Sequence, residues 1–344
     1  MTFPRGLNLG MARFSGLYLW AVIIIVFGIW TPNLFLASAT VHSIASSQSI
    51  VAMLAIAALI SMSVGAFDVS IGAVANLATI IAVSLQSMYH WGMWSAIGVA
   101  LASSAAVGFV NGFMIVKLKI SPIVATLGMG SILLAVQTIV SKAGQPFPPL
   151  DPVWPHLTQR KIGGFQIVFL YLVILAVVVW YVMEHTPAGR YIYAVGGNAD
   201  AARLSGVKVS RWTWASLVVS STICGFAGVA YGSLSGPSLT YGGTMLLPAF
   251  AAVFLGSTQI KPGRFNLWGT MLAVFVLATG VQGLQFVTGV QWLNDMFSGA
   301  ALILAVAFAG WRQRRAATAR RLSRRAALQA RDAESADDRV LTPA

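Results

Sequence analysis

The sequence predicts an all-α polytopic membrane protein, and three observations lead to this fold class. Apolar residues make up 57% of the 344 and charged residues only 9%, whereas soluble domains carry about 25% charged residues. Apolar segments long enough to form helical spans recur along the chain. Lysine and arginine gather in alternate connections between these segments. So few charged residues cannot cover the surface of a water-soluble protein of this size, and we expect most of the chain to lie in lipid.

About ten segments are candidates for transmembrane helices, because a hydrocarbon core of about 30 Å needs roughly 20 helical residues. Two of them are short and adjoin glycine-rich or polar stretches, which predicts broken or short helices near 65–85 and 245–256. The ten segments are Leu17–Phe35, Ile50–Ala66, Ile71–Leu85, Trp91–Val116, Ile123–Val140, Phe165–Met183, Trp212–Leu234, Met245–Gly256, Leu267–Val287 and Met296–Trp311.

The distribution of basic residues predicts the orientation. With ten spans and a cytoplasmic N-terminus, 19 of the 22 lysines and arginines fall on the cytoplasmic side. The positive-inside rule then places both termini in the cytoplasm. We therefore expect a cytoplasmic segment over 1–16, a transmembrane domain over 17–311 and a basic tail over 312–344 that rests near anionic lipid.

Several classes of function are excluded at this stage. The formal net charge of +13 reflects membrane topology rather than nucleic-acid binding, since no nucleic-acid motif accompanies it. No nucleophile and base are arranged for catalysis, and no residues have metal-ligand spacing. The phosphate-binding pattern G-x-x-x-x-G-K-[ST] does not occur, so we expect neither an ATPase site nor a bound cofactor. The proline-rich connection Ser141–Gly164 is expected to form an ordered, non-helical cap outside the membrane.

The connection at about 184–211 carries the most informative pattern. Asn198 is a favourable N-cap residue, Asp200 suits a first helical turn, and Gly206 suits the position just past a helix C-terminus. Together they predict a helix of about seven residues, which is too short to cross a membrane. A short helix capped at both ends in a cytoplasmic loop indicates a docking element rather than a simple linker.

Polar and aromatic side chains within or beside the spans are the candidates for a solute path. Asp68 lies near membrane depth, where an unpaired carboxylate is costly, and its alternative role is to cap the helix that begins at Ile71. Amides inside spans have the alternative role of hydrogen-bonding helices together. The candidates are Phe67, Asp68, Asn76, Asn111, Gln137, Gln282 and Gln285.

Three segments resemble the ribose-type family of ABC sugar permeases. Gly65–Gly72 is similar to that family's G-G-x-D-L-S-V-G stretch. Val110–Gly112 and Ile123–Gly128 are similar to its N-G-L…P-x-x-x-A-T-L-G block. Gly189–Gly206 is similar to its G-R-x-x-x-A-x-G-G-N-x-x-A-A-x-x-S-G-I signature. The resemblance extends in order from about Ile50 to Trp311.

This resemblance implies the helical fold of an ABC importer permease in the bacterial inner membrane. It implies a separate ABC ATPase subunit that hydrolyses ATP with Mg²⁺, a second permease copy, and a periplasmic sugar-binding protein. It also implies that the loop at 184–211 carries the coupling helix that contacts the ATPase. The residues carried over to this loop are Gly189, Arg190, Gly196, Gly197, Asn198, Ala201, Ala202, Arg203, Leu204, Ser205 and Gly206.

The chain departs from the ribose-type pattern at two places. Leu246-Leu247-Pro248 replaces a Glu-Leu-Asp triplet, and Gly256-Ser257 replaces a pair of glycines. The identity of the solute therefore stays open within the sugar class. The alternatives are a branched-chain amino acid-type ABC permease and an ion-coupled secondary transporter. The second alternative would place ionisable residues within spans, and here Asp68 and Asp295 are the only candidates.

Overall fold

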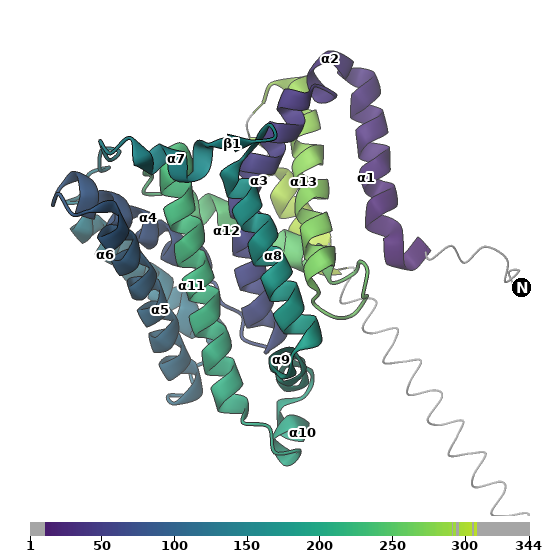
Figure 1. Ribbon diagram of the computed structural model, residues 1–344. Coiled ribbons are helices and arrows are strands. Elements are labelled where there is room, and N and C mark those ends of the chain that lie inside the picture. Colours follow the sequence, from purple (N-terminus) through teal and green to yellow (C-terminus); the bar gives the residue numbers. More distant parts are fainter. Residues whose placement is uncertain (1–10, 291, 294–295, 305, 308–344) are drawn as a thin grey trace, which may run out of the picture.

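The computed structural model describes residues 11–290, 292–293, 296–304 and 306–307, and it is built almost entirely of helices (Figure 1). The long helices are α1 (Met11–Trp30), α3 (Ser38–Ser63), α4 (Ile71–Ser87), α5 (Met93–Val116), α6 (Pro122–Val140), α8 (Ile167–His185), α11 (Val209–Ser235), α12 (Tyr241–Gly256) and α13 (Leu267–Thr288). The short elements are α2 (Pro32–Phe35), α7 (Val153–Gln159), α9 (Pro187–Gly197), α10 (Ala199–Leu204) and an antiparallel hairpin of β1 (Lys161–Ile162) and β2 (Phe165–Gln166).

Six of the described helices, α3, α5, α6, α8, α11 and α13, are long and apolar enough to cross a membrane. Apolar helices of ten to seventeen residues cover Phe14–Trp30, α4 and α12. The multi-span helical class is therefore confirmed, whereas the number of ten spans is not. The sequence correctly predicted that α4 and α12 are short, but both are continuous helices rather than broken ones.

Helix α3 forms the centre of the bundle, and α4, α8, α11, α12 and α13 pack around it (Figure 1). Residues 50–59 of α3 are all buried, on every side of the helix. A helix that is apolar all round suits the core of a large protein or the interior of a membrane. Its small side chains, Ala52, Ala55, Ala57 and Ala58 among them, let those neighbours approach closely.

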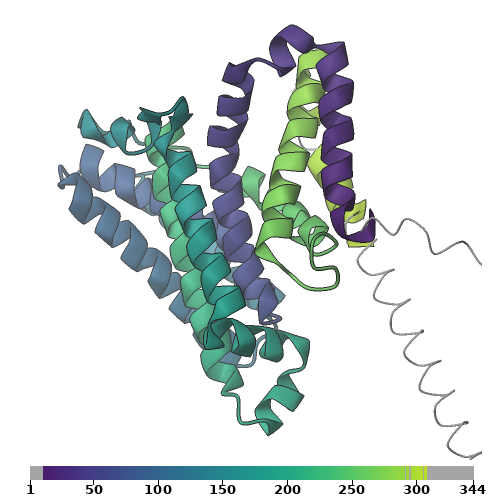
Figure 2. The same ribbon diagram turned by 45° about the vertical axis from the view of Figure 1, so that its right-hand side comes forward.

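The outer helices bury one face and expose apolar side chains on the other. In α5, α6 and α8 only about a third or less of the most apolar stretch is buried within the chain. Helix α1 lies at one edge of the molecule, next to α13 (Figure 2). Trp20 donates a hydrogen bond from Nε1 to Thr279 Oγ1 at 3.0 Å and fixes α1 against α13. Exposed apolar faces of this extent suit lipid contact.

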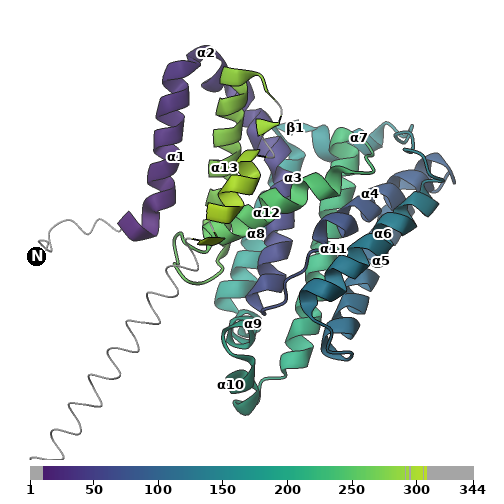
Figure 3. The ribbon, with the colours of Figure 1, turned by 180° about the vertical axis from the view of Figure 1, so that it is seen from behind.

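Helix α12 runs across the bundle and contacts α3, α4 and α13 (Figure 3). Its start touches the start of α4 through two glycines. A Cβ atom on Gly72 would lie 2.2 Å from Gly242 O, and one on Gly242 would lie 2.1 Å from Gly72 O. No larger residue fits at either position, so this backbone contact sets the distance between the two short helices.

Two elements differ from the sequence predictions. Helix α3 begins at Ser38, twelve residues before the predicted span, and in this added stretch Ser46 and Ser49 donate their hydroxyls to carbonyl groups four residues earlier. The proline-rich connection contains helix α7, which follows Pro152 and tolerates Pro155 in its first turn. Trp154 of α7 is buried and donates to Gly232 O on α11 at 3.2 Å.

Helices α9 and α10 lie at one end of the bundle, which we call the α10 end, and α7 and the hairpin lie at the opposite end, the hairpin end (Figure 1). Residues 1–10 of the predicted cytoplasmic segment 1–16, and the whole of the predicted tail 312–344, lie outside the described residues. The same holds for Asp295 and for the last residues of the span predicted at Met296–Trp311.

Candidate functional site

Helix α10 is a six-residue helix that is capped at both ends, close to the seven residues predicted. Asn198 Oδ1 accepts a hydrogen bond from Ala201 N at 3.0 Å, as an N-cap side chain does. At the other end Gly206 adopts a φ of +83°, and Val207 N donates to Ala202 O at 3.0 Å. This left-handed glycine with a backbone bond across the last turn is a Schellman motif. The local sequence therefore defines this helix without help from distant packing.

Helix α10 projects from the α10 end of the bundle and packs mainly on α9 and the start of α11 (Figure 1). Ala202 is its buried anchor, whereas the Leu204 side chain is 91% exposed. Arg203 and Asp200 form an exposed ion pair at 3.7 Å, which adds little to stability. A capped helix that presents an apolar side chain and charges to solvent is suited to binding another protein.

Helix α9 holds α10 against the bundle through two glycines of the predicted loop. A Cβ atom on Gly189 would lie 2.0 Å from Met183 O at the end of α8, and one on Gly196 would lie 2.0 Å from Ser63 O at the end of α3. Ile192 is buried on the same side of the helix. Gly189 and Gly196 therefore serve close packing, whereas Arg190 is exposed and nothing lies within 4 Å of a Cβ on Gly197.

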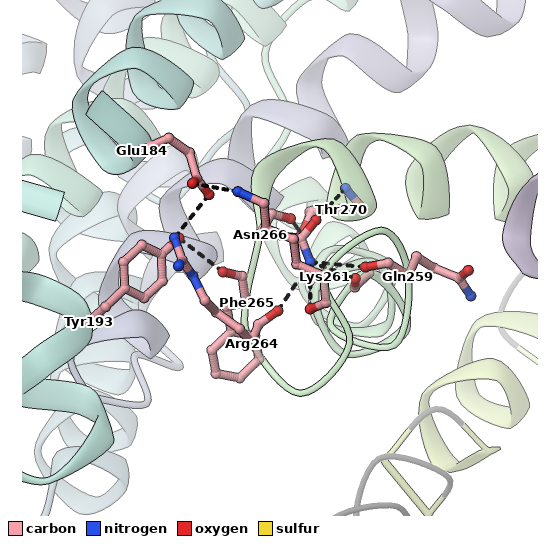
Figure 4. Close-up of polar contacts among 10 residues, drawn as sticks. Glu184, Tyr193, Gln259, Lys261, Arg264, Phe265, Asn266 and Thr270 are labelled. Carbon is pink, nitrogen blue, oxygen red and sulfur yellow. Dashed lines mark hydrogen bonds and ion pairs between the residues drawn. The ribbon is translucent and has the colours of Figure 1, made fainter. Parts of the chain in front are cut away.

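A charged cluster beside α9 joins three parts of the chain (Figure 4). Glu184, near the end of α8, forms ion pairs with Lys261 and Arg264 in the connection between α12 and α13. The Arg264 guanidinium lies 3.7 Å from the centre of the Tyr193 ring of α9, a cation–π contact. Tyr193 donates from its hydroxyl to Phe265 O at 2.9 Å. Burial raises the pKa of Tyr193, against the opposing effect of Arg264, so the phenol keeps its proton for this bond.

The connection 257–266 is itself ordered by Asn266, the N-cap residue of α13 (Figure 4). Asn266 Oδ1 accepts from Gly269 N at 2.9 Å, and Asn266 Nδ2 donates to Gly256 O at 3.2 Å and Gln259 O at 3.1 Å. Gln259 Oε1 in turn accepts from Gly16 N of α1 at 2.7 Å. This connection therefore contacts α1, α8, α9, α12 and α13.

The segment Gly65–Gly72 contacts α5 and α6 at the two stretches Val110–Gly112 and Ile123–Gly128, which also resemble the family pattern. Asp68 Oδ1 accepts from Ser70 N at 2.9 Å and from Ser70 Oγ at 2.6 Å, and Asn111 Nδ2 of α5 donates to the same hydroxyl at 3.0 Å. Thr126 of α6 accepts from Val69 N at 3.0 Å. Asp68 and Asn111 are fully buried. Asp68 thus holds the turn before α4 through Oδ1, whereas its Oδ2 is buried with no hydrogen-bond partner among the described residues. The N-cap residue of α4, Ser70, makes no side-chain capping bond. Both the capping role and the path role of Asp68 therefore stay predictions.

The remaining predicted path residues lie in three different surroundings. Asn76 and Gln137 are buried and bond to each other and to Leu239 O, so their amides join α4 and α6 to the segment before α12. Phe67 stacks on Phe250 of α12 at 4.8 Å between ring centres. Gln282 and Gln285 lie on α13, and of these two Gln285 lines an open cleft. The structure therefore does not bring the predicted path residues together at one place.

The cleft lined by Gln285 lies between α3, α12 and α13 and has a volume of about 760 Å³. Its lining is mixed: Ser47, Gln48, Thr244 and Ser298 are polar, whereas Val51, Met245 and Leu277 are apolar. Sequence reasoning identified Gln285 but missed Ser47 and Gln48. The signal was present, because the first half of α3 is rich in serine, but the predicted span began only at Ile50.

Sequence reasoning also missed the charged cluster around Glu184. The available signal was that Glu184 ends a long apolar run, and that it is one of nine acidic residues in the chain. An acid at that position needs a partner near the membrane face. Which of the basic residues supplies it depends on the packing of α8 beside the α12–α13 connection, and this is not visible in the sequence.

Comparisons with known proteins place these features in a family. The fructose import permease protein of Rhizobium meliloti is 29% identical over 84% of this chain and 82% of its own length. The ribose import permease protein of Escherichia coli K12 is 28% identical, over 83% of this chain and 89% of its own. The D-allose transport system permease protein of the same strain is 22% identical, over 88% and 93%. No solved structure gave a significant match.

A family-wide comparison matches residues 40–306 to the family described as branched-chain amino acid transport system / permease component. The match covers both short helices, the charged cluster and α10, so it includes every feature described above except α1 and α2. The chain belongs to this family of transport permeases.

Proposed function

We propose that this chain is the membrane-spanning permease subunit of an ATP-driven importer that carries a sugar or a sugar-like solute into the cytoplasm. Two observations carry the proposal. The similar proteins named above are permeases for fructose, ribose and D-allose, and each match covers more than four fifths of both chains. The second is the capped helix α10, which projects from the bundle with Leu204 exposed.

The proposed partners follow from this function. A separate ABC ATPase hydrolyses ATP with Mg²⁺, a second permease copy completes the path, and a periplasmic sugar-binding protein delivers the solute. We place the protein in the bacterial inner membrane with ten spans and both termini in the cytoplasm, because this arrangement puts 19 of 22 basic residues on the cytoplasmic side. The α10 end then faces the cytoplasm and the ATPase. This chain carries no ATPase site of its own and holds no cofactor.

The mechanism we propose is alternating access driven through the loop at 184–211. The ATPases move when they bind and hydrolyse ATP, and they displace α10 and α9. Helix α9 contacts the 257–266 connection through Tyr193, which packs on Arg264 and bonds to Phe265 O. Because this connection joins α12 to α13, the displacement reaches two of the three helices that line the cleft. Nucleotide state thus alters the cleft without a charge pair inside it.

The amino acid alternative shares the family but is not favoured, since the relatives named above carry sugars. The ion-coupled alternative needs an ionisable group that faces a path. Asp68 is buried on the turn before α4 and is engaged with Ser70. It is not among the described residues that line the cleft between α3, α12 and α13.

Reconstitution tests the proposal. The chain is placed in proteoliposomes with the ATPase and the solute-binding protein encoded beside it, and uptake of radiolabelled ribose, fructose and allose is measured with and without ATP. We expect uptake of a sugar that requires ATP and both partners. Uptake that persists without ATP and without the ATPase would overturn the importer function.

The docking role has a separate test. Asn198→Ala removes the N-cap, which costs about 1 kcal/mol of helix stability. We expect it to weaken the association of the ATPase with the permease and to lower the uptake per ATP hydrolysed. Asn198→Asp keeps an acceptor for Ala201 N and is the matched control. Equal coupling in both variants would contradict the docking role.

A further inference from the structure

Two hollows in the structure meet at Ser47 of α3. The first is the cleft of about 760 Å³ between α3, α12 and α13, which we call the inner cleft. The second, of about 560 Å³, lies beside the β1–β2 hairpin and the end of α11, and we call it the hairpin hollow. Ser47 lines both. The hairpin, whose residues Lys161, Gly164 and Gln166 line the second hollow, lies at the end of the bundle opposite α10 (Figure 1). Ser47 therefore borders both a hollow at the hairpin end and the inner cleft.

The side chains of α3 change along the helix, from serine-rich in its first part to apolar further on. Its first part contributes Ser38, Ser43, Ser46 and Ser47 to the hairpin hollow, and Gln166 and Ser235 face them from the other side. From Ile50 onward the helix is apolar and buried in the bundle. Ser46 is buried and bonds to His42 O, and Ser47 bonds to Ile44 O. A hydroxyl bonded in this way still has a lone pair for water or a hydroxylated ligand.

The inner cleft offers amide groups that are free to bind a ligand. Within the described part of the chain, the side chains of Gln48 and Gln285 form no hydrogen bond, and both line the cleft. The buried amides of Asn76 and Gln137 are instead occupied by each other and by Leu239. An unoccupied amide offers two donors and an acceptor with two lone pairs, which matches the alternating donors and acceptors of neighbouring hydroxyl groups.

The charge of the inner cleft narrows the class of ligand. No Asp, Glu, Lys, Arg or His is among its described lining residues. A cleft of about 760 Å³ is within the range of small-molecule sites, roughly 300–1,000 Å³. Trp292 adds a broad aromatic side chain that is 60% exposed, against which an apolar face of a ligand can pack. A neutral, polyhydroxylated molecule fits this lining, whereas an anion or a cation finds no counter-charge among the described residues that line the cleft.

We propose that the solute crosses the permease along the hydroxyl-rich face of α3, through the hairpin hollow into the inner cleft, and that Gln48 and Gln285 bind its hydroxyl groups there. This proposal rests on the proposed function and names its path and the residues that line it. It replaces the earlier expectation that Asn76 and Gln137 line the path, because these two amides are committed to contacts within the protein. Asn111 is fully buried and lines neither the inner cleft nor the hairpin hollow.

Cysteine labelling tests the path without relying on transport. Cys224 is the one native cysteine and is buried. On a Cys224→Ala background, single substitutions Ser47→Cys, Gln285→Cys and Gln282→Cys are treated with a membrane-impermeant methanethiosulfonate in the assembled transporter. Gln282 is the matched control, since it is an amide on the same helix with similar exposure and lies outside the cleft. We expect modification at 47 and 285 and none at 282. The native background, in which Cys224 is shielded, serves if Cys224→Ala reduces expression.

Uptake kinetics test the role of the amides. Gln48→Leu and Gln285→Leu each remove hydrogen bonds worth about 0.5–1.5 kcal/mol, so we expect a loss of uptake of roughly threefold to tenfold. Gln282→Leu should import at the wild-type rate. Labelling at 282 as fast as at 285, no labelling at 47 and 285, or normal uptake by both leucine variants would each overturn the path while wild-type uptake continues. Absence of ATP-dependent uptake by the wild type would instead overturn the proposed function.

Discussion

Glu184 and Arg264 are 80 residues apart in the chain, and they are joined by a hydrogen-bonded ion pair of 3.0 Å. The same carboxylate pairs with Lys261, so one acidic residue of α8 binds two cations of the α12–α13 connection. The Glu184 side chain is 14% exposed, whereas those of Lys261 and Arg264 are 45% and 41% exposed. This arrangement makes Glu184 the shared partner on which the position of the connection depends.

Graded substitution of Glu184 is expected to uncouple the transporter in proportion to the charge change. Glu184→Gln keeps a hydrogen-bond acceptor but loses the negative charge, and Glu184→Lys places a third cation beside two others. We expect uptake per ATP hydrolysed to fall slightly in the first variant and strongly in the second. Uptake and phosphate release in proteoliposomes measure this ratio.

The stability of the same variants separates coupling from folding. Partly exposed ion pairs contribute about 0.2–1 kcal/mol each, so Glu184→Gln should leave the unfolding temperature in detergent nearly unchanged. A large loss of stability together with a proportional loss of both uptake and ATP hydrolysis would show that Glu184 serves folding alone. Normal coupling in Glu184→Lys would remove the charged cluster from the mechanism.

Gly242→Ala is expected to destabilise the contact between α4 and α12. The added methyl group would lie 2.1 Å from Gly72 O, and backbone cannot yield as the end of a flexible side chain does. Overpacking of this kind costs about 1–3 kcal/mol. Gly243→Ala is the control one residue away, since nothing lies within 4 Å of its Cβ. Thermal unfolding in detergent should separate the two variants, and equal unfolding temperatures would contradict the close contact.

Local signals in the sequence predicted the local features of the structure. The apolar runs predicted the six described helices that are long and apolar enough to cross a membrane, and Asn198 and Gly206 located both ends of α10 to within one residue. Helix α7 was missed because its prolines were taken to exclude a helix, although Pro152 precedes it and Pro155 lies in its first turn, where no hydrogen-bonded N–H is required.

The site could be predicted less well, because it depends on contacts between distant segments. Nothing in the sequence distinguishes Gln285, which faces the cleft, from Gln282, which does not. Asn76 and Gln137 are polar side chains within apolar spans, as path residues are expected to be, but both bind Leu239 O. Glu184 and Arg264 are ordinary residues at the ends of apolar segments until the fold brings them together.

Leu204→Ser is expected to weaken docking without affecting the fold. The Leu204 side chain is 91% exposed in the isolated chain, and surface substitutions usually change stability by less than about 0.5 kcal/mol. An apolar side chain that fills a pocket in a partner is in contrast often a major contribution to binding. Co-purification of the ATPase with the permease measures the effect. Ala202→Ser is the informative comparison, since Ala202 is buried and should affect stability as well. Undiminished ATPase binding by Leu204→Ser would show that this side chain does not contact the partner.

Asn266 combines two roles that substitutions can separate. Asn266→Ala removes both the cap on Gly269 N and the donors to Gly256 O, Gln259 O and Arg264 O. Asn266→Ser keeps an N-cap acceptor but lacks the amide donors. Asn266 is 2% exposed, so water does not readily replace the lost bonds. We expect the alanine variant to lose about 2–3 kcal/mol of unfolding free energy. The serine variant should lose about 1 kcal/mol less than the alanine variant, because it keeps the cap. If thermal unfolding shows the same loss for both, the cap contributes nothing, and the donors of Nδ2 alone hold the 257–266 connection in place.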